Sequence, residues 1–166
     1  MFGIGNSRDF FSKLQEDHKS FNAQPDSASL AVNCILASYH LHECVWGDWP
    51  KEDYDARRAK KIRDRDSFVD WISAYCPCLP IVRDLANGAK RFSQDSSVQT
   101  ARVGGFGEGP FGAGPFGQPY LLIDLGESTG ILHRWQRAEE LIDQVVGFWE
   151  EFFDKYRPDN RGQASN

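Results

Sequence analysis

The sequence lacks the features that would place it at a membrane or outside the cell. No apolar run is long enough to span a bilayer, and the opening MFGIGNSRDFF has neither the basic start nor the long apolar stretch of a secretory signal. We therefore expect a cytoplasmic protein with no membrane partner. In that compartment its four cysteines stay reduced, so no disulfide framework is expected.

Basic residues are also in the minority. Lys and Arg number 19 against 24 Asp and Glu, which gives a formal net charge of −5. Such a chain has no general attraction to nucleic acid, so nucleic acid is not the expected partner. The chain does have 166 residues, of which 40% are hydrophobic and 13% aromatic, enough for one buried core. We expect a single helical domain over residues 1–157 and a disordered tail over 158–166.

Helical periodicity dominates the pattern of apolar residues. Predicted helices run from Asn6 or Ser7 to about Phe21, from Asp26 or Ser27 toward Trp46, from Asp66 to Pro77, from Pro80 to Phe92, and from about Arg134 to Tyr156. The last has the clearest stripe: Trp135, Ala138, Ile142, Val145, Trp149, Phe152 and Tyr156. The charged run KEDYDARRAKKIRDRD, residues 51–66, is typical of a solvated helical face or connection. These segments predict a mainly α, single-domain bundle of about five helices.

Two candidate strands, Ser97–Val103 and Tyr120–Leu125, predict a small β-hairpin inserted at about 97–125. Its loop is the glycine-rich stretch GGFGEGPFGAGPFGQP, which reads as three five-residue turns. The turns place Phe106, Phe111 and Phe116 at equivalent positions. Two interpretations stay open: a connection with its rings tucked against the domain, or a surface ribbon that offers three rings to a partner.

Phosphate-binding motifs do not fit this stretch. G-x-G-x-x-G occurs twice within it, but Gln118 and Pro119 lead into a predicted strand, whereas a dinucleotide site needs a helix there. No G-K-[ST] follows, which excludes a P-loop. The kinase signatures H-R-D and D-F-G are absent downstream.

Histidine and cysteine supply two weaker candidate sites. His42 and Glu43 begin the zinc-protease motif H-E-x-x-H, but Trp46 occupies the second histidine position. A different set, a structural zinc site, would combine one histidine with three cysteines: His40, Cys44, Cys76 and Cys78. The spacing C-P-C differs from the usual C-x2-C, and cysteines on apolar helix faces commonly act as small buried hydrophobes. We expect no metal and no other cofactor.

The second candidate is acid–base chemistry by His40 and His42. Lys90 or Arg91 would steady a phosphate during RNA cleavage by such a pair. The alternative is one histidine bonded in the core and one at the surface.

The chain resembles bacterial conserved hypothetical proteins of similar length in four segments: SASLAVNCILASYHLHECVWGDW, VRDLANGAKRF, GGFGEGPFGAGPFG and VVGFWEEFF. Its helix-rich order also resembles HEPN-type bundles, which include ribonucleases. The catalytic signature of that family is an arginine followed four to six residues later by a histidine. The nearest basic segment here, Asn87–Arg91, has no histidine, so the departure from the signature argues against ribonuclease activity and permits a non-catalytic relative.

Taken together, the motifs favour a non-enzymatic protein-interaction module. Phe106, Phe111 and Phe116 would contact a protein partner or a second copy of the chain. The alternatives are a HEPN-like bundle that binds or cleaves RNA and a small structural zinc protein.

Overall fold

The computed structural model describes residues 4–49, 53–91, 99–103, 120–125 and 135–158, with the backbone alone for 89–91 and 99–103. These residues form six α-helices and a three-stranded antiparallel sheet. The mainly α class with a small hairpin, which the periodicity predicts, is confirmed. Of the helices described, none is both long and apolar enough to cross a bilayer.

Helices α1 (Ser7–Ala23) and α2 (Ala28–Asp48) begin at the predicted caps. The Asn6 side chain accepts a hydrogen bond from the Asp9 N–H, and the Ser27 hydroxyl accepts one from the Leu30 N–H. Each bond satisfies a backbone donor that the first helical turn leaves unpaired. Both helices continue two residues beyond their predicted ends.

The charged run after α2 holds a short helix that the sequence left undecided, α3 (Tyr54–Ala59), and the start of α4 (Arg65–Tyr75). The predicted cap of α4 was wrong by two residues, because Asp64 caps this helix. Asp64 accepts from the Ser67 N–H at 2.8 Å, and the Ser67 hydroxyl accepts from the Asp64 N–H at 2.9 Å. This reciprocal pair needs its members three residues apart, a condition that Asp64 and Ser67 meet.

Strands β1 (Gln99–Val103) and β2 (Tyr120–Asp124) pair antiparallel, with Ala101 opposite Leu122, so the predicted hairpin is confirmed. The predicted start of the last helix was wrong. Trp135–Arg137 forms β3 and pairs with the other edge of β2, and α6 runs over Ala138–Tyr156. A three-residue strand is stable only where a neighbouring strand supplies hydrogen bonds, which the local pattern does not reveal.

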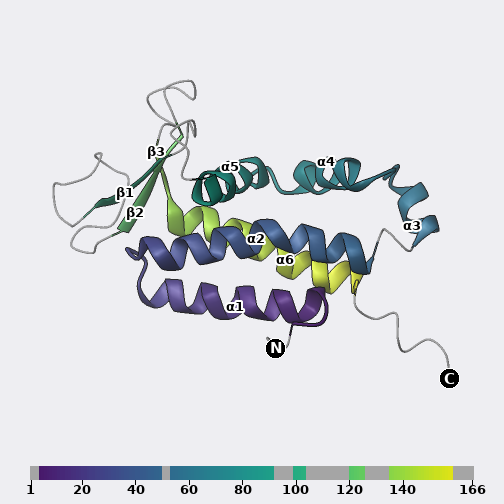
Figure 1. Cartoon of the computed structure of the whole chain (residues 1–166), viewed down its shortest axis with the longest axis horizontal. Helices are drawn as coiled ribbons and strands as arrows, with labels where there is room; N and C mark the ends of the chain where they lie inside the picture. The colour runs from purple at the N-terminus through teal and green to yellow at the C-terminus, as the bar shows by residue number, and fades with distance from the viewer. Residues whose placement is uncertain (1–3, 50–52, 92–98, 104–119, 126–134, 159–166) are drawn as a thin grey trace.

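Figure 1 shows α1, α2 and α6 side by side along the long axis, with α4 and α5 (Leu79–Arg91) end to end along α2. The sheet lies at one end of the molecule and α3 at the other. Helix α2 touches α1, α4, α5 and α6, which explains its apolar residues on several faces. The largest fully buried side chains include Trp149, Phe21, Phe68 and Phe153.

Candidate functional site

His40 and His42 lie two residues apart on α2, so their side chains leave the helix in different directions. His42 is buried, with 3% of its surface exposed, and its ring Nδ1 donates a hydrogen bond to the Tyr39 carbonyl oxygen. His40 is partly exposed, and its Nδ1 lies 3.3 Å from the Glu43 carboxylate. This division matches the predicted alternative of one buried and one surface histidine.

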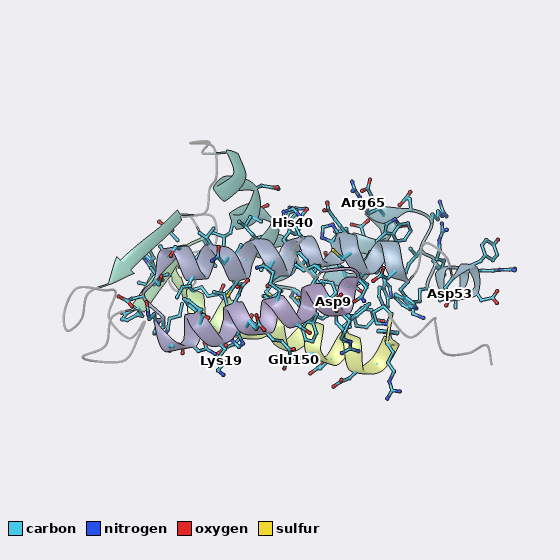
Figure 2. The ribbon with its side chains drawn as sticks, turned by 60° about the horizontal axis from the view of Figure 1, so that its bottom comes forward. Asp9, Lys19, His40, Asp53, Arg65 and Glu150 are labelled. Atoms are coloured by element: carbon cyan, nitrogen blue, oxygen red, sulfur yellow. The ribbon has the colours of Figure 1, made fainter. Side chains whose placement is uncertain are left out.

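A polar pocket of about 270 Å³, here called the His42 pocket, lies between α2, α4 and α5. It is lined by Tyr39, His42, Glu43, Arg65, Asp66, Val69, Asp70 and Arg83. His40 lines a separate pocket between α1 and α2, so the structure does not unite the two histidines in one cavity. Figure 2 shows His40 and Arg65 along the same edge of the molecule, and the Glu43 carboxylate lies within 4 Å of both.

The cations at this pocket are Arg65 and Arg83, which the sequence reasoning missed. Lys90 and Arg91, the predicted phosphate-binding residues, belong to the last turn of α5, and their side chains lie outside the described residues. Arg83 is seven residues before Lys90 and therefore on the same side of α5. That helical spacing was the one signal that pointed to Arg83.

Burial lowers the pKa of His42, because desolvation penalises the imidazolium. The Tyr39 carbonyl and Glu43 act in the opposite direction without overcoming it, and Arg65 and His40 add to the lowering. A carbonyl oxygen only accepts hydrogen bonds, so the proton of the neutral ring is on Nδ1. Nε2 then carries the lone pair, and it has no hydrogen-bond partner among the residues the structure describes.

The lowered pKa of His42 predicts a specific pH dependence of stability. The unfolded chain takes up this proton near pH 6.5, the ordinary value, while the folded protein resists it. The free energy of unfolding should therefore fall as the pH drops below about 6.5, with a slope of at most about 1.4 kcal/mol per pH unit. Charged side chains face His42 from three helices: Glu43 on α2, Arg65, Asp66 and Asp70 on α4, and Arg83 on α5.

Urea titrations between pH 5 and pH 8 test this prediction. His42→Asn removes the titrating ring and keeps a side-chain N–H near the position of Nδ1. We expect a smaller loss of stability at low pH in this variant than in the wild type. If the free energy of unfolding fell equally with pH in the two proteins, His42 would not be the group responsible.

The structure does not arrange the predicted zinc residues, His40, Cys44, Cys76 and Cys78, as one set of ligands. Cys76 and Cys78 lie together at the junction of α4 and α5, whereas Cys44 is on α2 beside a different pocket. Across the described parts of the chain, no group of three or more His, Cys, Asp or Glu side chains is arranged to hold a metal ion. The geometry of the described residues therefore gives no support to a zinc site at these positions.

An aromatic pocket, here called the aromatic groove, opens between α4 and α6. It is lined by Trp71, Ile72, Tyr75, Phe148, Glu151, Phe152, Lys155 and Tyr156. The rings contact one another, with centroid distances of 5.5 Å for Trp71–Tyr156 and 4.9 Å for Phe152–Tyr156. Tyr75 is 64% exposed, which is unusual for a large ring beside a packed cluster.

Beside this groove, Lys60 places its ammonium over three rings. Nζ lies 5.5 Å from the Trp49 centroid, 5.9 Å from Trp71 and 5.4 Å from Tyr156. Ring faces attract cations, so this contact attaches the C-terminal end of α3 to the bundle. Helix α3 has no buried residue of its own, which makes the contact important for its position.

Lys60→Gln is expected to lower the free energy of unfolding by about 1 kcal/mol, because it removes the cation from the rings. Lys61→Gln removes the same charge from an exposed neighbour and should change stability by less than about 0.5 kcal/mol. Urea denaturation followed by tryptophan fluorescence measures both. Equal losses would mean that the net charge, and not the aromatic contact, decides the effect.

The predicted partner-binding residues Phe106, Phe111 and Phe116 lie outside the described residues, as does nearly all of the predicted tail. The polar His42 pocket and the aromatic groove are two candidate sites on the described surface. Comparison of the chain with protein families, with curated proteins and with solved structures finds no match.

Proposed function

We propose that the protein is a non-enzymatic protein-interaction module. The observation that carries this proposal is the aromatic groove between α4 and α6, with the exposed ring of Tyr75 at its edge. Aromatic side chains that protrude beside a pocket are typical anchors of protein interfaces. On α6, Glu151 supplies a negative and Lys155 a positive side chain beside the rings. Charged and polar groups of this kind are typical of an interface rim.

The packing of the groove supports binding without a large ordering cost. Trp71 contacts Phe152 and Tyr156 from the opposite helix, so these rings are held in place before a partner arrives. Because these rings are already ordered, little conformational entropy is lost on binding, and more of the contact energy contributes to affinity. Phe106, Phe111 and Phe116 would supply a second contact with the partner or with another copy, as their spacing in the sequence predicts.

A crosslinked pull-down with two matched variants tests the proposal. Tyr75 and Tyr54 are both exposed, at 64% and 70%, but Tyr54 is on α3 and does not line the groove. We expect Tyr75→Ser to lose a protein that the wild type and Tyr54→Ser both retain, with a reduction of about tenfold. A third arm replaces Phe106, Phe111 and Phe116 by serine. Identical partners in all arms would refute the proposal.

RNA binding or cleavage is the second candidate, and the His42 pocket favours it. Here a neutral imidazole, whose Nε2 has no hydrogen-bond partner among the described residues, lines one pocket with two arginines. His42 would accept the proton of a ribose 2′-hydroxyl, and Arg65 or Arg83 would hold the phosphate. The net charge of the chain and the carboxylates of the pocket oppose this function, so it ranks second.

RNA cleavage assays with two histidine variants test this candidate. His42→Asn removes the basic ring nitrogen from the pocket, whereas His40→Asn changes a histidine that does not line it. We expect any cleavage by the wild type to be lost in the first variant and retained in the second. Equal rates for both variants would exclude His42 as the base.

A further inference from the structure

Cys76 and Cys78 lie at the junction of α4 and α5, separated by Pro77. Backbone hydrogen bonds connect this turn to α4 on one side and to α5 on the other. The Cys76 N–H donates to Ile72 at 2.8 Å, the Cys76 carbonyl accepts from Leu79 at 2.9 Å, and the Cys78 carbonyl accepts from Val82 at 3.0 Å. Proline adds a restricted φ angle between the two cysteines. Both thiols are therefore presented by a turn with little freedom.

The two sulfur atoms lie 3.1 Å apart within the hydrophobic core. Cys76 is 2% exposed and Cys78 is 7% exposed, so Cys78 is the nearer to solvent. The two remaining cysteines form a natural comparison. Cys34 and Cys44 are ten residues apart on α2, about 15 Å along a helix, and cannot reach each other.

The two thiols have different electrostatic surroundings. Cys78 immediately precedes α5, and the positive end of the helix dipole favours a negative sulfur at that position. A hydrogen bond from the Cys76 thiol holds the pKa of Cys78 below its ordinary value, while the same contact and burial raise the pKa of Cys76. By contrast, burial raises the pKa of the isolated Cys34 to about 12. Cys78 is thus the better nucleophile of the pair.

We propose that Cys76 and Cys78 are a redox modification site that closes into an intrachain disulfide when it is oxidised by hydrogen peroxide. The Cys78 thiolate attacks one peroxide oxygen, the O–O bond breaks, and hydroxide leaves, which gives a sulfenic acid at Cys78. The Cys76 sulfur then attacks Sγ of Cys78, the S–O bond breaks, and water leaves with the Cys76 proton. Two thiols and one peroxide yield one disulfide and two waters.

Peptide mapping of the native, full-length protein tests the proposal. The protein is treated with peroxide, unfolded, alkylated with iodoacetamide and digested with trypsin. Residues 66–83 form one tryptic peptide with Cys76 and Cys78, and residues 20–51 form another with Cys34 and Cys44. We expect the first peptide to become lighter by two hydrogen atoms, to resist alkylation, and to recover after dithiothreitol. The second should be alkylated at both cysteines before and after peroxide.

Two outcomes in the wild type would overturn the proposal. One is full alkylation of peptide 66–83 after peroxide, with the circular dichroism of the folded protein unchanged. The other is accumulation of sulfinic acid at Cys78, which would mean that Cys76 fails to reach it. Neither outcome depends on a variant that fails to fold.

Single variants test the order of attack. Cys76→Ala removes the resolving thiol, so dimedone should trap a sulfenic acid at Cys78. Cys78→Ala leaves Cys76 without its partner, and we expect several-fold less labelling there. Labelling of equal extent in the two variants would overturn the assignment of Cys78 as the attacking thiol.

Discussion

Replacing Trp149 by alanine is expected to lower the free energy of unfolding by about 3–5 kcal/mol. Trp149 is fully buried on α6, and its indole N–H donates to the Ser38 carbonyl oxygen on α2 at 3.0 Å. Truncation leaves a cavity between the two helices and also leaves that carbonyl without this donor.

Trp149→Phe separates these two contributions. Phenylalanine keeps most of the ring packing but lacks the N–H, so we expect a loss of about 1–3 kcal/mol. Midpoints and slopes of urea denaturation measure both variants against the wild type. A loss below about 1 kcal/mol for Trp149→Ala would contradict the central position of this ring in the core.

The second large effect is expected for Phe153→Ala, again about 3–5 kcal/mol. Phe153 on α6 is fully buried and stacks on Phe11 of α1, with ring centroids 4.6 Å apart and planes 10° from parallel. The Arg8 guanidinium, also on α1, lies 4.9 Å from the Phe153 centroid. The variant thus loses burial, the ring pair and a cation contact together.

A double-mutant cycle with Phe11→Ala measures the ring pair by itself. We expect a coupling of about 0.5–1.5 kcal/mol, the usual range for an aromatic pair. Additive losses in the double variant would mean that the two rings contribute only through burial. Circular dichroism of each variant before denaturation shows whether the helices persist.

The extents of the helices were largely predictable from the sequence, because their signals are local. The caps at Asn6 and Ser27 need only a side chain and a backbone N–H three residues later. The apolar stripe of α6 was also read correctly at Ile142, Val145 and Trp149, all of them buried. The errors were at Trp135, which pairs with β2, and at Asp66, where a better capping partner lay two residues earlier.

The candidate sites were less predictable. The spacing of His40 and His42 already indicated opposite directions on a helix, which favours the interpretation of one buried and one surface histidine over the interpretation that placed both in one site. The groove rings of α4 and α6 lie more than seventy residues apart in the chain, so no local pattern unites Tyr75 with Phe148. The pairing of the two thiols beside Pro77 was visible as C-P-C, but not their 3.1 Å separation.

The sequence by itself determined the helical class, the starts of α1, α2 and α5 to within one residue, and the hairpin strands, because periodicity, capping and alternation act over a few neighbouring residues. Tertiary structure alone decided that Trp135–Arg137 joins a sheet, that Arg65 and Arg83 share a pocket with His42, and that α4 and α6 form an aromatic groove. The first depends on hydrogen bonds from β2, a partner that the apolar pattern of residues 135–137 does not reveal. The other two depend on contacts between segments far apart in the chain, and such contacts exist only once the helices have packed around a common core.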